Sequence, residues 1–125
     1  RFPRFEVGVP VLDPGSLLPA VAGAIAPSRH VGVVTPLESQ VEIVKEIWEA
    51  DGFSVTVAVD SPYHEGGIEA AAAVMAAARP EVVMLDCMGL GPAYRDEFAR
   101  LSGVPAISAQ TLLAKVAGEL AGGLS

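Results

Sequence analysis

The chain has 125 residues, which is enough for one domain with a single hydrophobic core. Apolar residues make up 51% of it, which excludes an intrinsically disordered protein, and a formal charge of −7 excludes the basic surface that a nucleic-acid partner requires. The single cysteine excludes an internal disulfide and a cysteine-based zinc cage, and it favours a reducing compartment.

The N-terminal part of the sequence reads as an extended lead-in. Residues 1–15 contain three prolines and two glycines, and a short helix is predicted over 16–26 with Ser16 as its cap. We therefore divide the chain into a lead-in with a short helix, 1–28, and an α/β domain, 29–125. Because the chain opens on Arg1 and not on methionine, we also expect a fragment of a longer protein.

From His30 onward, short apolar runs alternate with helical patterns. Strands are predicted over 30–34, 53–59, 81–85 and 104–107, with helices after each of them. The first of these helices has a capping box, with Thr35 as N-cap, Pro36 at N1 and Glu38 at N3. The last is capped by Ser108 and ended by Gly122-Gly123. Its predicted buried stripe consists of Leu112, Leu113, Val116, Ala117 and Leu120.

Alternating strands and helices predict a three-layer αβα fold around a four-stranded parallel sheet of order 2-1-3-4. Ligands of such sheets bind beyond the carboxyl ends of the strands, where the strand order reverses. Here that place lies between the first and third strands. The loops around Thr35 and Pro36 and around Cys87, Met88 and Gly89 should meet there, with Ser108 and Gln110 on a third side. Helices that start at these loops would favour an anion such as a carboxylate.

Cys87 is the strongest single candidate for chemistry. An ionised thiol is a good base or nucleophile, and nearby helix amides favour its ionisation. A buried structural cysteine is the alternative, and the neighbouring Asp86 would disfavour the thiolate unless its carboxylate points away. Tyr94 falls on the inward face of its helix and reads as a core residue, while His30 reads as structural and His64 as a solvated loop residue.

The segment 80–90, PEVVMLDCMGL, also resembles the phosphoacceptor strand of response-regulator receiver domains, with Asp86 as the acceptor. The resemblance fails at two places that such domains need. The first strand is followed by Val34-Thr35-Pro36 in place of an acidic pair, and no lysine follows a fifth strand.

Three segments together resemble the AroM family, a branch of the aspartate/glutamate/hydantoin racemase superfamily. They are HVGVVTPLESQ at 30–40, VVMLDCMG at 82–89 and VPAISAQTLLAKVAGEL at 104–120. The resemblance implies a chain that forms the second, C-terminal half of a two-domain racemase-like fold. It also implies a small carboxylate-bearing substrate, Cys87 as the catalytic thiol of this half, and Thr35 with the backbone of Met88 and Gly89 holding the carboxylate. Neither a metal nor a cofactor is implied.

The resemblance departs from the racemases in one respect, because Cys87-Met88-Gly89 stands where glutamate racemases have Cys-Thr-His. Amino-acid racemisation is therefore not the expected reaction. Two hypotheses remain besides the receiver: a cysteine-dependent racemase- or isomerase-like enzyme, and a module that binds a small anion without chemistry. We expect a cytoplasmic protein with no membrane partner, because no apolar run approaches the roughly 18–20 residues of a membrane span. We also expect it to self-associate or to pair with the N-terminal half.

Overall fold

The computed structural model describes residues 14–60, 67–87 and 89–124. The elements there are, in chain order, α1 (Pro14–Ile25), β1 (His30–Thr35), the short 3-10 helix η2 (Glu38–Gln40), α2 (Val41–Ala50), β2 (Ser54–Val59), α3 (Gly67–Ala78), β3 (Val82–Leu85), α4 (Pro92–Ser102), β4 (Ala106–Ser108) and α5 (Ala109–Leu124).

The four strands form a parallel sheet of order β2-β1-β3-β4, which confirms the predicted topology. The two central strands are buried. β1 is buried from its second residue onward, and β3 is buried along its whole length. Both are apolar runs rich in valine, as expected for strands that are covered on both faces. The reversal of strand order therefore lies between β1 and β3, where ligands of such sheets bind.

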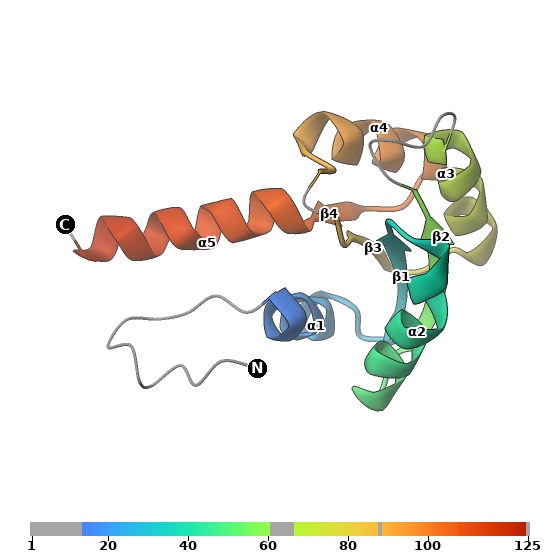
Figure 1. Ribbon diagram of the computed structural model, residues 1–125, viewed down its shortest axis with the longest axis horizontal. Helices are drawn as coiled ribbons and strands as arrows, with labels where there is room; N and C mark the ends of the chain where they lie inside the picture. The colour runs from blue at the N-terminus through green and yellow to red at the C-terminus, as the bar shows by residue number, and fades with distance from the viewer. Residues whose placement is uncertain (1–13, 61–66, 88, 125) are drawn as a thin grey trace.

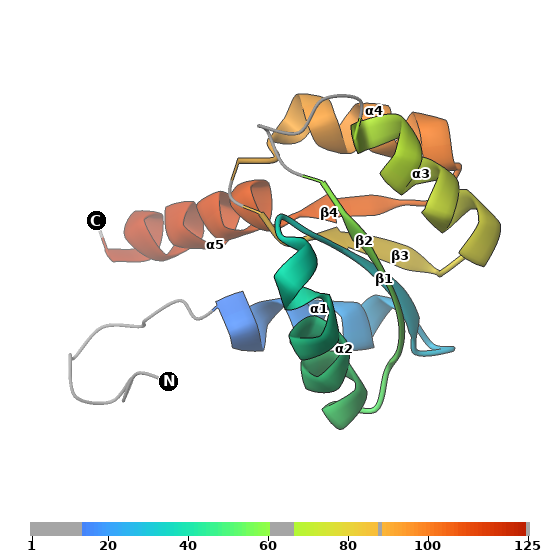
Figure 2. The ribbon, with the colours of Figure 1, turned by 45° about the vertical axis from the view of Figure 1, so that its right-hand side comes forward.

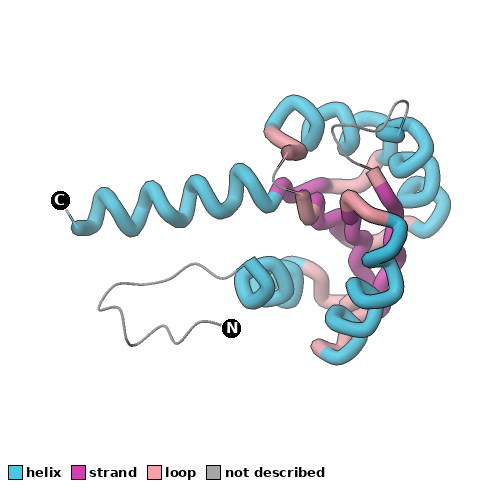
Figure 3. The backbone as a smooth tube through the Cα atoms, viewed as in Figure 1, coloured by secondary structure: helices cyan, strands magenta, loops and turns pink. Residues whose placement is uncertain are grey.

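Helices cover both faces of this sheet, so the fold has the predicted three layers (Figure 1, Figure 3). Successive side chains along each strand point to opposite faces of the sheet, where they belong to two separate hydrophobic cores. Val31, Val33 and Met84 pack with α1, α2 and the start of α5, whereas Val34 and Leu85 pack with α3 and α4. Below, these are called the α1/α2 side and the α3/α4 side.

Helix α1 contributes to the first of these cores. Leu18, Ala22 and Ala26 are at most 2% exposed and pack with the strands on the α1/α2 side. The helix begins at Pro14, two residues before the predicted cap Ser16. The segment that the sequence places in the lead-in therefore supplies part of the core of the α/β domain.

The capping box predicted at Thr35 is wrong. Thr35 is still part of β1, where it pairs with Val59, and its carbonyl accepts a hydrogen bond from the amide of Asp60 at 3.1 Å. Leu37 is extended as well (φ −128°, ψ 130°), and helical turns start only at Glu38. An extended Thr35 could still act as an N-cap, but with Leu37 extended no helix starts at Pro36 for it to cap.

Helix α5 differs from its prediction in two ways. It runs to Leu124, past the glycines that were expected to end it, and it projects from the body of the domain (Figure 1, Figure 2). Ala117 is exposed, and the other four residues of the predicted stripe are only half-buried. Within the described ranges, no helix is long and apolar enough to cross a membrane.

Candidate active site

Four chain segments meet at the carboxyl edge of the sheet. β1 ends at Thr35, β2 is followed by Asp60, β3 by Asp86 and Cys87, and β4 ends at Ser108. The parallel ladder continues for one residue beyond two of these ends. The amide of Asp60 donates to Thr35 O, and that of Asp86 donates to Val34 O at 2.9 Å. The backbone that presents these side chains is thus fixed by the sheet itself.

Cys87 occupies the centre of this edge. It is half-buried, and its side chain packs against the α3/α4 core. It therefore lies on the same side of the sheet as Leu85 and Val83, which are two and four residues earlier. A half-buried thiol at the switch point is both held in place and open to a ligand.

Asp86 is next to Cys87 in sequence but belongs to the other side of the sheet. Because its amide continues the β3 ladder, strand alternation turns its side chain away from that of Leu85. Burial raises the pKa of the Asp86 carboxyl above its ordinary value. The sequence left open whether this carboxylate points away from the thiol, and the alternation favours that arrangement.

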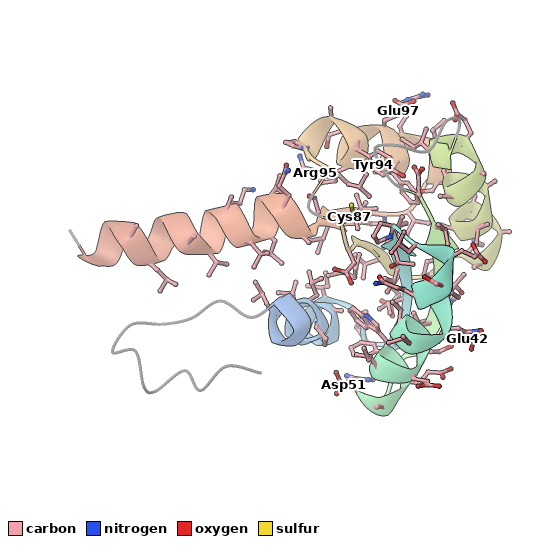
Figure 4. The ribbon with its side chains drawn as sticks, viewed as in Figure 1. Glu42, Asp51, Cys87, Tyr94, Arg95 and Glu97 are labelled. Atoms are coloured by element: carbon pink, nitrogen blue, oxygen red, sulfur yellow. The ribbon has the colours of Figure 1, made fainter. Side chains whose placement is uncertain are left out.

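Tyr94 on α4 reaches the same edge from above the α3/α4 side (Figure 4). Its hydroxyl donates a hydrogen bond to Asp60 Oδ2, and its ring stacks on Phe98 with the centroids 6.0 Å apart. Asp60 is 2% exposed. Burial, the hydrogen bond to Asp60 and the charges of Asp60 and Cys87 all raise the pKa of Tyr94, in that order of size. Tyr94 is therefore a neutral hydroxyl at physiological pH.

Hydrogen bonds pin both ends of the loop that carries the thiol. The amide of Leu90 donates to Cys87 O at 3.0 Å, and Leu90 O accepts from Ser108 Oγ at 2.7 Å. Ser108 Oγ also accepts from the amide of Thr111 at 3.3 Å, as an N-cap does. Ser108 therefore caps α5 as predicted, and its hydroxyl also donates a hydrogen bond to the loop at Leu90 O.

The other predicted site residues differ in how closely they approach the thiol loop. Gln110 lies against it, because a Cβ added to Gly91 would meet Gln110 Oε1 at 2.8 Å. Thr35 is 1% exposed at the end of β1, Pro36 is half-exposed and Gly89 is exposed. Met88 lies outside the described residues. The roles of these residues toward a substrate stay predictions.

Helix amides and cations are concentrated on one flank of the edge. Helix α4 starts after Gly91 with Pro92 at N1, as predicted, and α5 starts directly after Ser108, whereas no helix begins at Thr35. Arg95 and Lys115 line a depression of about 190 Å³ beside β4 and α5. Of these, Arg95 is already engaged, donating to Asp96 Oδ1 at 3.0 Å and to Thr111 Oγ1 at 3.5 Å. The N-terminal amides of α4 and α5 are therefore the groups on this flank that favour an anion.

No group of three or more histidine, cysteine, aspartate or glutamate side chains that could hold a metal ion occurs in the described part of the chain. The polar groups that do gather at the edge are a thiol, a phenol and carboxylates, and these groups transfer or hold protons.

Sequence reasoning missed Asp60 and Tyr94. Tyr94 was assigned to the core from its helical phase, and it does pack there on Phe98. The signal that could have found the pair is the position of Asp60. It follows a strand directly, and the carboxyl ends of parallel strands share one edge.

Comparisons with known proteins give a family and a shared fold. A family model described as "AroM protein" matches residues 1–121. Among solved structures, one titled "Crystal structure of arylmalonate decarboxylase" superposes with a TM-score of 0.69 at 20% sequence identity, which shows a shared fold. The match covers 96% of this chain and 56% of that protein, so the chain spans about half of that protein's length. No curated protein matches this chain.

Proposed function

Because this chain belongs to the AroM family, we propose that it supplies the thiol half of a site that transfers a proton at the carbon next to a carboxylate group. Cys87 is the acid or base in this proposal. The observation that carries it is the position of Cys87, half-buried two residues past the end of the central strand β3, at the point where the strand order reverses. In folds of this kind that position is where ligands bind.

The chemistry at such a carbon requires only a base, an acid and a way to hold negative charge. A thiolate takes the proton from the carbon, and the C–H electron pair moves into the adjacent carboxylate as an enediolate. Return of the proton from the thiol reverses the step. When the carbon carries a second carboxylate, loss of CO₂ leaves the same enediolate, and the thiol then donates the proton.

The cysteine count favours delivery of the proton to a single face. These 125 residues contain one cysteine, so they supply one thiol. Two-base racemisation needs an acid and a base on opposite faces of the carbon. Decarboxylation followed by protonation needs only one of them, and the structural neighbour is by its title a decarboxylase of arylmalonates. These residues alone therefore supply an acid or base for one face of the carbon, and a second such group would come from residues beyond them.

The substrate carboxylate is assigned to the groups around the thiol. Thr35 at the end of β1, the backbone around Met88 and Gly89, and the amide side chain of Gln110 are the proposed contacts. Pro36 would border the same space. Ser108 would act through the loop, because its hydroxyl proton is donated to Leu90 O.

Hydrogen–deuterium exchange tests the proposal. The full-length protein is incubated in D₂O with substituted malonates and with α-substituted monocarboxylates, and deuterium at the α-carbon is followed by ¹H NMR. We expect incorporation with at least one acid, and loss of at least about a hundredfold in rate for Cys87→Ser. Asp51→Asn on the exposed end of α2 serves as the control and should exchange normally.

The alternative is a module that binds a small anion without chemistry. It predicts saturable binding of one of these acids that is unchanged in Cys87→Ala, together with no exchange in the wild type. That pair of results would contradict the catalytic proposal. Labelling of Asp86 by acetyl phosphate would instead favour the receiver reading.

A further inference from the structure

The depression of about 190 Å³ beside the edge strand β4 is a feature that the proposed reaction does not use. Arg95 of α4 and Lys115 of α5 line it, and Cys87 is not among its lining residues. None of the described residues that line it carries a carboxylate. In a chain with a formal charge of −7, two cations around one hollow without an acidic neighbour in its wall favour a negatively charged ligand.

Arg95 is held in place but is only partly engaged. Its side chain is 29% exposed, Nε donates to Asp96 Oδ1, and Nη1 reaches across to Thr111 Oγ1 on α5 (Figure 4). A guanidinium group has five N–H donors, so these two bonds leave three of them for a ligand. The Asp96 side chain is 72% exposed, and water screens an ion pair with such a carboxylate. Arg95 is therefore directed toward α5 with donors to spare.

Lys115 brings the second cation from α5. It follows Thr111 by four positions, so the two side chains lie on the same face of the helix. Within the described part of the chain, no residue forms a hydrogen bond or an ion pair with the Lys115 ammonium group. Cations elsewhere have structural roles, since Arg29 donates to two backbone carbonyls and Arg100 is in an ion pair. The charge of Lys115 is thus available to a ligand.

The rest of the wall indicates what kind of anion would fit. Ala106, Ile107 and Leu112 give it an apolar part. Helix α5 begins at Ala109, so the positive end of its dipole lies at the same place as the two cations. Inorganic phosphate would leave the apolar part without a contact. A carboxylate on a short hydrocarbon chain matches both parts of the wall, in the way that ligand sites combine apolar surface with a few polar groups.

We propose that this depression is a second binding site, which holds a small aliphatic carboxylate with its charged end at Arg95 and Lys115 and its hydrocarbon part against Leu112. The carboxylate accepts hydrogen bonds from the guanidinium and ammonium groups, and such charge-assisted bonds are stronger than neutral ones. No bond is made or broken in this site. It goes beyond the proposed proton transfer and does not depend on it.

The test is a titration of the ¹⁵N-labelled full-length protein with butyrate, followed by NMR. We expect saturable shifts of the Arg95 Nε–H signal and of the backbone amides of Thr111 and Lys115. Lys115→Gln should raise the Kd from these shifts by at least about fivefold, because a neutral amide replaces a charged partner. Lys45→Gln, the same change on α2, is the matched control and should leave the Kd in place.

A second pair of variants tests the guanidinium group. Arg95→Gln should weaken butyrate binding in the same way, with Arg100→Gln farther along α4 as its control. The NMR spectrum of each variant also shows whether it is folded. Absence of saturable shifts at the depression would overturn the site, and so would a Kd that is the same in Lys115→Gln and Lys45→Gln.

The class of ligand is tested with two other anions. Acetate lacks two methylene groups of butyrate, so its Kd should be at least about threefold higher if the hydrocarbon part contacts the apolar wall. Phosphate at the same ionic strength should bind more weakly than butyrate. Equal binding of all three anions would overturn the assignment to an aliphatic carboxylate. Because binding is read at the depression and without chemistry, these results are independent of whether exchange at carbon is observed.

Discussion

Asp86 and Cys87 show how one residue step decides the chemistry of a strand end. The two are neighbours in sequence, but the ladder contact from the Asp86 amide to Val34 O extends β3 and assigns their side chains to opposite sides of the sheet. A carboxylate and a thiol that shared one face would oppose each other's ionisation. Their separation removes that conflict, and it leaves Asp86 as a half-buried carboxyl group with its own effect on stability.

Stability should depend on Asp86 in a pH-dependent way. Burial raises its pKa in the folded protein, so its favourable contribution is full below the unfolded value and is lost as the pH rises through the folded pKa. Asp86→Asn should therefore stabilise the protein relative to the wild type at pH 7, and this gain should shrink toward pH 4. Urea midpoints at both pH values measure it, with Asp51→Asn as the exposed control.

A gain that is the same at pH 4 and pH 7 would show that the ionisation of Asp86 is not its cause. Replacement of a hydrogen-bonding group or a change in packing would then be the explanation, because neither depends on the protonation of a carboxyl group.

The positions of two predicted site residues follow from local sequence, while their roles stay predictions. A cysteine two residues past the third strand of a parallel sheet, and a serine directly before a helix, have positions fixed by those elements. The structure places both as expected. Tyr94 could not be assigned in this way. Its helical phase predicts burial correctly, but its partner Asp60 lies 34 positions away and is brought near by tertiary packing alone.

At the level of elements, β1 and α3 pack tightly at Gly32. Gly32 faces Met75, which is fully buried, and a Cβ at Gly32 would stand 2.5 Å from Met75 Sδ and 3.2 Å from Pro80 Cγ. Only a residue without a side chain lets the helix approach the strand so closely. The valine-rich run around this glycine predicted the strand but gave no indication of this contact.

We expect Gly32→Ala to destabilise the protein by about 1–3 kcal/mol through overpacking. Urea unfolding measures the change. In a Met75→Ala background the added methyl group has space, so the same substitution should cost clearly less. Equal costs in both backgrounds would contradict the contact as the cause.

Gly118→Ala on α5 is the matched control for this substitution. A Cβ there meets no atom within 4 Å, and the residue is exposed on a helix. Alanine should stabilise this position by about 0.5–1 kcal/mol, because it loses less backbone entropy on folding than glycine. The same chemical change thus has opposite signs at a tightly packed strand position and at an exposed helix position.

The elements themselves could be predicted because their signals are local. Apolar runs of strand length, proline at the start of α4 and serine before α5 fix the type and order of the elements, and the crossover rule then gives the strand order. The start of α2 could not be read in this way. The capping pattern at Thr35 is a local signal for a helix, and the backbone hydrogen bonds that Thr35 shares with β2 outweigh it.

At the scale of the whole molecule, α5 is the element whose environment is incomplete. It packs on the sheet through Ala109 and Leu112, beside α1, and then projects beyond the domain (Figure 2). Leu113, Val116 and Leu120 continue an apolar stripe that the described residues leave only half-buried. A helix of this length extends about 24 Å, which is enough for a coiled contact with an equivalent helix.

We propose that a second copy of the chain covers this stripe, with the two α5 helices packed against each other about a two-fold axis. The expected mass of the chain at tens of micromolar is then about twice its 12.8 kDa, measured by light scattering after gel filtration. Val116→Asp places a charge in the contact and should give a monomer, whereas Ala114→Asp on the exposed face of the same helix should stay dimeric. A wild type that is monomeric at these concentrations, or two variants that behave alike, would contradict the pairing. In that case the stripe would belong to an interface with a different domain, and the self-association predicted from the sequence would be replaced by pairing with an N-terminal half.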